Sequence, residues 1–197
     1  MIHFTSDNHY FHHNVLSYAN RPFNSLDEMH NAMISNWNGV VGKNDTVYHL
    51  GDFFLTTKLD LIDGILDQLN GHIKILPGNH DQWLRKHARL RNASKIMLLS
   101  PLEEIKHYHN DKKYYLTLCH FPMLRWNKSH YGAIQLHGHS HGNLDEYNAT
   151  QPLIRMDVGV DSSQYTPINF EQILRYNREK IEKFESGGMN HHLNEDL

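Results

Sequence analysis

The chain has 197 residues, a net charge of −3 with neutral histidines, and hydrophobic residues at 39% of its positions. This length fits a single domain, and the apolar content is too high for a disordered protein. No apolar run approaches the roughly 18 residues of a membrane span, and the first residues lack a secretory pattern. The single cysteine, Cys119, excludes an internal disulfide framework. We expect one cytoplasmic domain over residues 1–186, a flexible tail at 187–197 and no membrane partner.

The first half of the chain alternates between strand and helix patterns. The predicted strands lie at 2–6, 46–50 and 73–76. The predicted helices lie at 26–37, 59–69 and 82–91, the last of them rich in basic residues. Ser25 and Glu28 have the spacing of a capping box, which places the start of the first helix at residue 26.

The second half contains mostly strand patterns. The predicted strands lie at 96–99, 104–109, 114–120, 134–137 and 153–158. Asn110 and Asp111 predict a hairpin turn, and Pro167 predicts the start of a last helix that runs through Phe184. Together, the two halves predict an α/β protein in which βαβ units join a more antiparallel sheet, with two sheets packed together.

Histidine is unusually frequent, with 18 residues against 19 lysines and arginines together. Neutral imidazole is a common metal ligand and a frequent general acid or base. A general nucleic-acid binder would be basic, which this chain is not. Composition alone leaves open whether the histidines are functional or only lie on the surface, so their positions have to decide.

Five short polar segments each follow a strand-like run. They are Asp7-Asn8-His9, Gly51-Asp52, Gly78-Asn79-His80-Asp81, His120 and Gly138-His139-Ser140-His141. Because the carboxyl ends of strands in open α/β sheets meet at one edge, these segments can converge on one site. Oxygen and imidazole ligands without a thiolate suit Mn, Fe or Zn, and one Asp can bridge two ions. Each segment alone is typical of an ordinary turn, whereas all five in this order indicate a shared metal site.

In this order, the five segments resemble the motif pattern of the calcineurin-like metallophosphoesterases. The resemblance covers residues 7–141, and His12, Asn14 and the Arg-Pro-Phe run at 21–23 resemble a small single-domain branch found in bacteria and their phages. It implies a two-sheet α/β/β/α sandwich and hydrolysis of phosphate esters. It also implies a location in the cytoplasm of a bacterium or of a phage-infected host.

The resemblance assigns roles to individual residues. One metal would be bound by Asp7, His9 and His141 and the other by Asn79, His120 and His139, with Asp52 bridging the two. His80 would face the substrate phosphate as a catalytic residue, and Asp81 would orient His80 by accepting its other ring N–H. Two divalent ions are implied, with Mn²⁺ expected first and Fe, Zn, Ni or Co as alternatives. Asp157 stands where this branch often has Asn, which bears on how the last loop is held.

The chemistry of such a site agrees with these roles. Two divalent ions about 3.5–4 Å apart stabilise the attacking and leaving oxygens of a phosphoryl displacement. A water that bridges them loses a proton near neutral pH and attacks as hydroxide. His80 can stabilise the charge that develops on the phosphoryl oxygens and can protonate the leaving oxygen.

His12, Asn14 and Arg21 are the candidate substrate-binding residues. Arg21 precedes a proline, so its backbone is extended and its guanidinium could contact phosphate, although a solvated loop arginine is the alternative. A small phosphate ester or nucleotide is the expected substrate, because the single domain has no extension that would grip a polymer. Nucleic acid is the alternative partner.

Three other functions remain open from the sequence. Basic residues at 85–95 would suit a nuclease that acts on DNA or RNA, or they form a solvated face. Arg125 and Trp126 could contact a base, or Trp126 could pack in the core.

A protein phosphatase would need a peptide groove, of which there is no sign. A catalytically dead binding module is opposed by the intact set of candidate ligands.

Overall fold

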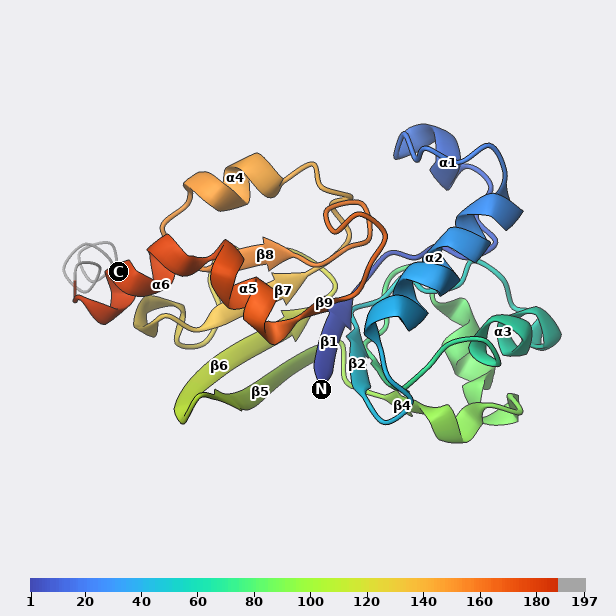
Figure 1. The fold of residues 1–197 in the computed structure, drawn as a ribbon, viewed down its shortest axis with the longest axis horizontal. Coiled ribbons are helices and arrows are strands. Elements are labelled where there is room, and N and C mark those ends of the chain that lie inside the picture. Colours follow the sequence, from blue (N-terminus) through green and yellow to red (C-terminus); the bar gives the residue numbers. More distant parts are fainter. Residues whose placement is uncertain (188–197) are drawn as a thin grey trace.

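The computed structural model describes residues 1–187, which form an α/β fold with two mixed sheets lying side by side (Figure 1). The first sheet has the strand order β4-β3-β2-β1-β9, and β9 alone runs antiparallel to its neighbour. Its strands are β1 (Ile2–Thr5), β2 (Thr46–His49), β3 (His72–Ile75), β4 (Ile96–Leu98) and β9 (Ile168–Asn169). The predicted tail at 187–197 lies outside the described residues except for Gly187.

The second sheet has the order β5-β6-β7-β8, with an antiparallel β5–β6 hairpin and parallel pairs elsewhere. Its strands are β5 (Leu102–His109), β6 (Lys112–Cys119), β7 (Ile134–His137) and β8 (Arg155–Asp157). Asn110 and Asp111 have φ angles of 49° and 60° at the hairpin turn. Both values suit a two-residue turn whose twist matches that of the strands, as the sequence predicts.

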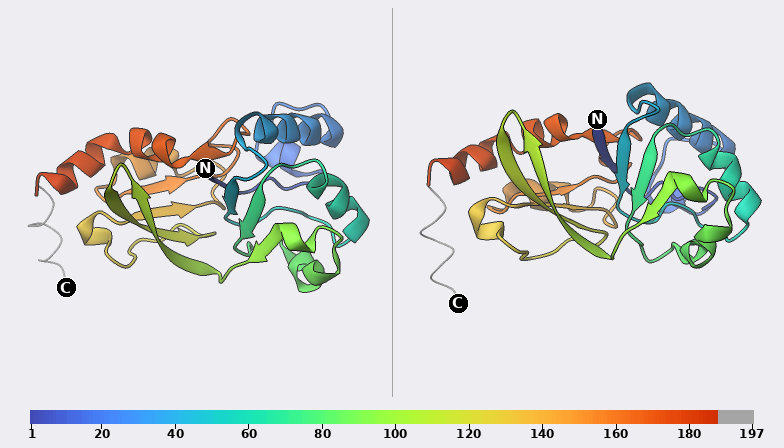
Figure 2. Two further views of the ribbon diagram at one scale, coloured as in Figure 1. Left: turned by 60° about the horizontal axis from the view of Figure 1, so that its bottom comes forward. Right: turned by 90° about the horizontal axis from the view of Figure 1, so that it is seen from below.

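Six helices surround the sheets in the part of the chain that the structure describes. They are α1 (Val15–Tyr18), α2 (Leu26–Val40), α3 (Leu59–Leu66), α4 (Asp145–Thr150), α5 (Phe170–Tyr176) and α6 (Arg178–Glu185). Short 3₁₀ segments lie at η1 (Gln82–Arg89), η2 (Ala93–Lys95) and η3 (Ser129–Tyr131). Figure 2 shows α2 and α3 along the outside of the first sheet, and α5 and α6 along the outside of the second. None of these helices is long and apolar enough to cross a membrane.

Helix α2 begins where the sequence predicts, with one difference in its cap. The Ser25 side chain accepts a hydrogen bond from the Glu28 amide, which satisfies one of the free donors at the helix start. The Glu28 carboxylate accepts from the Asn24 amide and side chain rather than from Ser25. The capping box is therefore half formed, and the second half is displaced by one residue.

The last predicted helix is wrong in its start and in its continuity. Residues 168–169 form β9, which pairs with Phe4 and His3 of β1 instead of continuing a helix from Pro167. The helix begins at Phe170 because Asn169 and Gln172 form a complete capping box. The predicted helix at 82–91 is the 3₁₀ segment η1, whose buried residues Trp83 and Leu84 are adjacent and so form no helical stripe.

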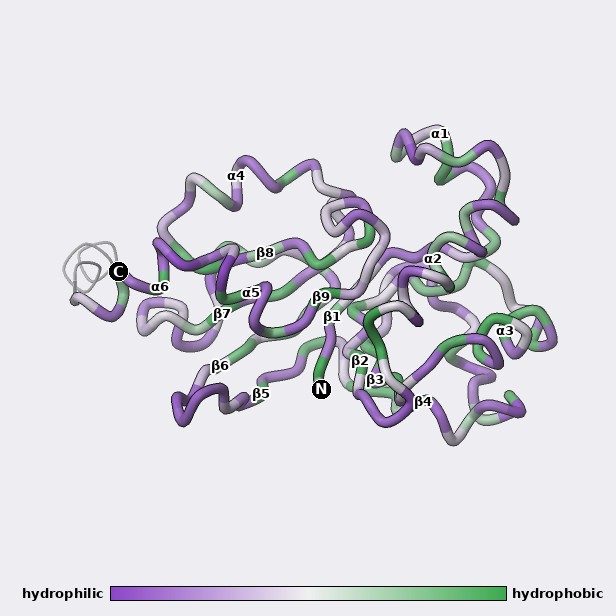
Figure 3. The backbone as a smooth tube through the Cα atoms, viewed as in Figure 1, coloured by the Kyte–Doolittle hydropathy of each residue, from purple (hydrophilic) through white to green (hydrophobic). Residues whose placement is uncertain are grey.

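Two apolar cores lie on opposite faces of the first sheet, because alternate strand residues point to opposite sides. Val47, Ile73 and Ile75 pack in one core with α2 and α3. Phe4 packs in the other core with the second sheet and α5. Figure 3 shows hydrophobic residues along β6 and β7, and hydrophilic residues on α6 and at the tip of the β5–β6 hairpin.

Candidate metal centre

The five polar segments meet because backbone hydrogen bonds join the loops that carry them. The Asp7 amide donates to the Gly51 carbonyl at 3.0 Å, and the His9 amide donates to the Asp52 carbonyl at 3.0 Å. In the second sheet, the Gly138 amide donates to the His120 carbonyl at 3.0 Å. These loops follow β1, β2, β6 and β7, so the site lies at the carboxyl ends of strands from both sheets.

All seven predicted ligands are brought together in this place. The potential ligand atoms form two groups, Asp7, His9 and His141, and Asp52, His120 and His139, each within 4.8 Å of one another. Asp52 Oδ2 lies 3.6 Å from His9 Nε2 and 3.4 Å from His120 Nε2, which places its carboxylate between the groups. Asn79 Oδ1 completes the set at 3.1 Å from His120 Nε2. Each group takes residues from loops of both sheets.

Hydrogen bonds orient two of these histidines for metal binding. His120 Nδ1 lies 2.8 Å from the Leu50 carbonyl oxygen, and His141 Nδ1 lies 2.6 Å from Asp161 Oδ2. Both oxygens can only accept from the ring, so each Nδ1 carries a proton and Nε2 is the nitrogen that faces a metal, which would displace any proton held there. This arrangement is typical of histidines that bind a metal through Nε2.

Two polar atoms of the site are buried without a hydrogen-bond partner among the described residues. They are Asp7 Oδ1 and His9 Nε2, which lie 3.8 Å apart. Burial lowers the pKa of His9 to about 2, so its ring is neutral and can offer a lone pair. Burial raises the pKa of Asp7 to about 7, which marks a carboxylate that needs a nearby cation to remain charged. Oxygen and imidazole donors in this state fit divalent ions such as Mn²⁺, Fe²⁺ or Zn²⁺.

Five of the seven candidate ligands have a left-handed backbone conformation. The φ angles are 58° for Asp7, 51° for His9, 57° for Asp52, 67° for His139 and 47° for His141. Each such conformation of a non-glycine residue costs energy, of order 1–3 kcal/mol, and is typically found at functional sites. A Cβ at Gly138 would overlap the Asp7 carboxylate, so that glycine permits the close approach of two of these loops.

His80 lies beside the two ligand groups and belongs to neither. Its amide donates to Asp52 Oδ1 at 2.8 Å. Its half-buried ring lies 5.5 Å from the His9 ring and 5.9 Å from the His12 ring, measured between centroids. No hydrogen bond to the His80 ring is present within residues 1–187, so the ring can turn toward a bound molecule.

The structure corrects the role expected of Asp81. Its carboxylate accepts from the backbone amides of Asp52, Phe53 and Gly78 and from the Trp83 indole, at 2.6–2.9 Å. These four donors occupy the carboxylate, so it does not accept from the His80 ring. Asp81 instead joins the loops after β2 and β3 and thereby positions Asp52.

The structure also corrects the role expected of Arg21. Its side chain is fully buried, and it donates twice to the Asp161 carboxylate at 2.8 Å and once each to the carbonyls of Asp7 and Asn8. The guanidinium is therefore not available to a substrate phosphate. The sequence reasoning missed Asp161, which binds both Arg21 and His141, although the Val-Gly-x-Asp motif at 158–161 was the signal for it.

The remaining candidates divide between the site and other places. His12 Nδ1 lies 3.1 Å from His9 Nδ1, which places His12 at the centre. Asn14 is exposed at the start of α1 and makes no side-chain cap. Asp157 accepts hydrogen bonds from Ser140 and from the Gly142 amide, and so holds the loop that carries His139 and His141. The Asp157 carboxylate therefore stabilises this loop through its own hydrogen bonds.

Contacts decide one of the other open alternatives and bear on a second. Trp126 is buried and donates to the Ala133 carbonyl at 3.0 Å, which places it in a core cluster. Arg91 pairs with Asp67, and Lys95 donates to the carbonyl of Leu66 at 2.7 Å. Two of the five basic residues at 85–95 are thus used within the fold.

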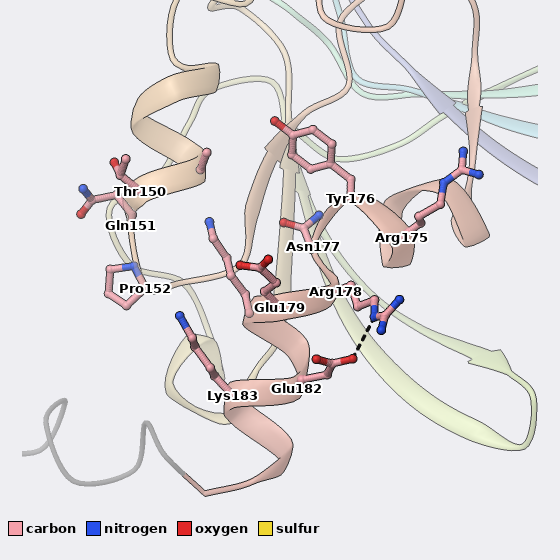
Figure 4. Close-up of a pocket in the computed structure, with 12 residues that line it drawn as sticks. Thr150, Gln151, Pro152, Arg175, Tyr176, Asn177, Arg178, Glu179, Glu182 and Lys183 are labelled. Carbon is pink, nitrogen blue, oxygen red and sulfur yellow. Dashed lines mark hydrogen bonds and ion pairs between the residues drawn. The ribbon is translucent and has the colours of Figure 1, made fainter.

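A separate hollow of about 940 Å³ lies between the end of α4 and helices α5 and α6 (Figure 4). Its lining includes Arg178, which donates to Glu182 at 2.9 Å, and Lys183. None of the candidate site residues lines it.

Comparison with known proteins gives relatives without an assigned activity. No family model matches the chain. The gene 66 protein of Mycobacterium phage D29 is 28% identical over 188 residues, covering 81% of this chain and 87% of that protein. A crystal structure of AQ665, a protein of unknown function from Aquifex aeolicus, shares the fold with a TM-score of 0.66 at 22% identity, covering 89% of this chain and 98% of that one.

A further relative is closer in sequence than these two. The uncharacterized protein MJ1445 of Methanocaldococcus jannaschii is 34% identical over 179 residues, which cover 88% of this chain and 89% of that protein. Identity at this level over nearly the full length of both proteins indicates common descent. The chain therefore belongs to the same protein family as MJ1445.

Proposed function

We propose that the protein is a phosphoesterase that depends on two divalent metal ions and has the calcineurin-like α/β/β/α sandwich. The observation that carries this proposal is the position of Asp52 between two three-residue ligand groups. A carboxylate in that position can bind one ion with each group, as dinuclear hydrolytic sites require. When bound, the ions would supply Lewis-acid activation of water and of the phosphoryl oxygens.

The charge of Asp52 suits a bridging role. Burial raises its pKa, but the hydrogen bond and charge of His120 and the bond from the His80 amide outweigh this effect. The pKa of Asp52 is lowered to about 2, so the residue is a carboxylate at any physiological pH. Because Asp81 fixes the amide of Asp52, the carboxylate is held in place before any ligand binds.

His80 is the residue that we assign to proton transfer. In the proposed reaction, a water oxygen loses a proton to solvent and bonds to phosphorus, the ester P–O bond breaks, and the leaving oxygen takes a proton from the His80 ring, which solvent then protonates again. The ring lies beside the ligand groups, its amide is anchored on Asp52, and its nitrogens are not engaged by the described residues. A positioned acid of this kind contributes about 10²- to 10⁴-fold to the rate.

The test is hydrolysis by the full chain loaded with Mn²⁺. We expect hydrolysis of bis(p-nitrophenyl) phosphate or p-nitrophenyl phosphate, loss of activity after chelation, and two ions per chain by elemental analysis. Asp52→Asn should lose both activity and metal, because the bridge is gone. His80→Ala should lose about 10²-fold or more in kcat and keep two ions.

Two results would contradict the proposal. The first is a single bound ion in the wild type with no hydrolysis of either ester under Mn²⁺, Fe²⁺ or Zn²⁺. The second is the loss of an ion in His80→Ala, which would make His80 a ligand. Asp67→Asn serves as the control, since Asp67 is an exposed carboxylate outside the site.

A further inference from the structure

Two half-exposed aromatic rings border the candidate metal centre, one beside each ligand group. The Tyr18 ring lies 5.4 Å from the His141 ring and 5.5 Å from the His12 ring. The Phe121 ring lies 4.7 Å from the His139 ring and 4.9 Å from the His120 ring. One ring therefore borders the ligand group of Asp7, His9 and His141, and the other borders the group of Asp52, His120 and His139.

Both rings leave apolar surface open to solvent beside the centre. All eight phenylalanines lie in the described part of the chain, and Phe121 is the one that is exposed, at 46%. Tyr18 is 51% exposed. Neither ring takes part in the apolar clusters of the protein. Apolar surface left open beside a set of polar groups is typical of a ligand-binding site.

The buried arginine beside the centre is fully engaged within the protein, which leaves the ester groups of a substrate to the rings at the rim. The guanidinium of Arg21 is not free to contact a substrate, because its N–H groups donate to Asp161 and to two backbone carbonyls. The rings of His12, His80, Tyr18 and Phe121 lie beside the centre, where they can meet a substrate. A phosphodiester places one charge on the metals and offers two neutral ester groups to such rings.

We propose that Tyr18 and Phe121 form the two walls of a substrate cleft that selects phosphodiesters carrying a planar aromatic group, as a nucleoside does. The inference rests on the proposed function, since it names the substrate class of the same site. Stacking of a base on an aromatic side chain tolerates any base, because every base has a π-face. The walls therefore select for a nucleoside ester in general and not for one base.

The experiment compares two diesters with the same leaving group, thymidine 5′-(p-nitrophenyl) phosphate and methyl p-nitrophenyl phosphate. Both release p-nitrophenol, so the ratio of their kcat/KM values reports recognition of the nucleoside and not the ease of bond cleavage. We expect the Mn²⁺-loaded wild type to favour the thymidine ester by about 10-fold or more. Tyr18→Leu and Phe121→Leu should each bring this ratio toward 1, whereas Tyr18→Phe and Phe121→Tyr should retain it.

Tyr131→Leu is the matched control, because Tyr131 is 72% exposed on η3 and lies outside the centre. It should leave the ratio unchanged. A binding readout accompanies the kinetics: titration calorimetry should show that the wild type binds thymidine 5′-phosphate more tightly than methyl phosphate, and that the two leucine variants lose the difference. Metal content is measured for every variant.

The outcomes separate the inference from the proposed function. Hydrolysis of both diesters with a ratio near 1 overturns the aromatic cleft and leaves the phosphoesterase standing. Equal losses on both substrates in the leucine variants, with the ratio kept, would show that the rings only support the histidines and would also overturn the cleft. No hydrolysis of either diester by the loaded wild type would overturn the proposed function and the inference with it.

Discussion

At the scale of single residues, Arg21 and Asp161 show how a side chain remote in sequence prepares a ligand. The two lie 140 positions apart, and their buried ion pair joins the segment between α1 and α2 to the loop after β8. Asp161 also accepts from His141 Nδ1 at 2.6 Å, which fixes the ring with Nε2 facing the centre. Arg21 thereby positions Asp161, and Asp161 positions the candidate metal ligand His141.

Replacement of Asp161 should weaken metal binding without removing a ligand. We expect Asp161→Asn to lower the affinity for one of two Mn²⁺ ions by about 10- to 100-fold, because the orienting carboxylate is lost. Titration of the metal-free protein by calorimetry measures the two affinities separately. Asp67→Asn should leave both unchanged, and an equal affinity in Asp161→Asn and the wild type would contradict the role.

The five polar segments and the family resemblance pointed to the seven candidate ligands, whereas the residues that support them were missed, for a physical reason. Ligands such as Asp7 and His9 lie together in one short loop at the end of one strand, so their spacing is visible in the sequence itself. The partners of Arg21 and Asp81 depend on how loops from different strands approach one another. A proline after Arg21 or a histidine before Asp81 carries no information about that approach.

At the scale of elements, β2 brings a fully buried histidine into the core beside the site. His49 Nε2 donates to Asn8 Oδ1 at 2.8 Å, and His49 Nδ1 accepts from the Gly51 amide. Burial lowers the pKa of His49 to about 3 from its ordinary value of 6.5. The ring is therefore neutral in the folded protein and charged in the unfolded chain between these two pH values.

This difference makes stability depend on pH with a definite sign. Between pH 6.5 and about 3, the unfolded chain binds a proton that the folded protein does not, so the free energy of unfolding falls as the pH is lowered. We expect His49→Gln to reduce the slope of the free energy of unfolding against pH, between pH 4 and 6, by the contribution of about one proton. Urea unfolding of the metal-free protein at a series of pH values measures the slope.

His72→Gln, at an exposed position of β3, is the control for a histidine-to-glutamine substitution outside the core. An unchanged slope in His49→Gln would mean that His49 titrates normally in the folded protein.

The elements that the sequence predicted well are those with a local signal. The β5–β6 hairpin follows from its two turn residues, and α2 follows from Ser25 and its buried stripe. β9 was missed because its two residues gain their strand conformation only from pairing with β1, far away in the sequence. The sequence predicts an α-helix for the basic segment η1 because its composition favours helix. In the structure, the Trp83 indole of this segment donates a hydrogen bond to Asp81.

At the scale of the whole molecule, the distribution of positive charge separates what a small substrate and a polymer would each contact. Arg85, Lys86 and Arg89 are exposed on η1, which begins directly after Asp81. A nuclease would use such a face to contact the phosphates of a strand, whereas hydrolysis of a small ester needs only the residues around the centre. Arg91 pairs with Asp67 within the fold and is less free to do so.

We therefore expect the triple variant Arg85→Gln, Arg89→Gln, Arg91→Gln to retain the wild-type kcat/KM on small diesters. We also expect weak dependence of activity on salt between low and physiological concentration. Each contact to a single strand contributes about −0.7 to the log–log slope of affinity against salt. A nuclease would be supported instead if the affinity for single-stranded DNA fell steeply with salt and the triple variant reduced that log–log slope by about 2.

Each ligand group takes residues from loops of both sheets, so bound ions would act as cross-links between the two halves of the molecule. A ligand that binds only the folded state stabilises it in proportion to the logarithm of its concentration over Kd. Amide hydrogen exchange should then slow in β1 and β2 of one half and in β7 of the other when Mn²⁺ is added. Slower exchange in one half alone would contradict this coupling, whereas slower exchange in both would mean that opening the two halves and releasing the ions are one event.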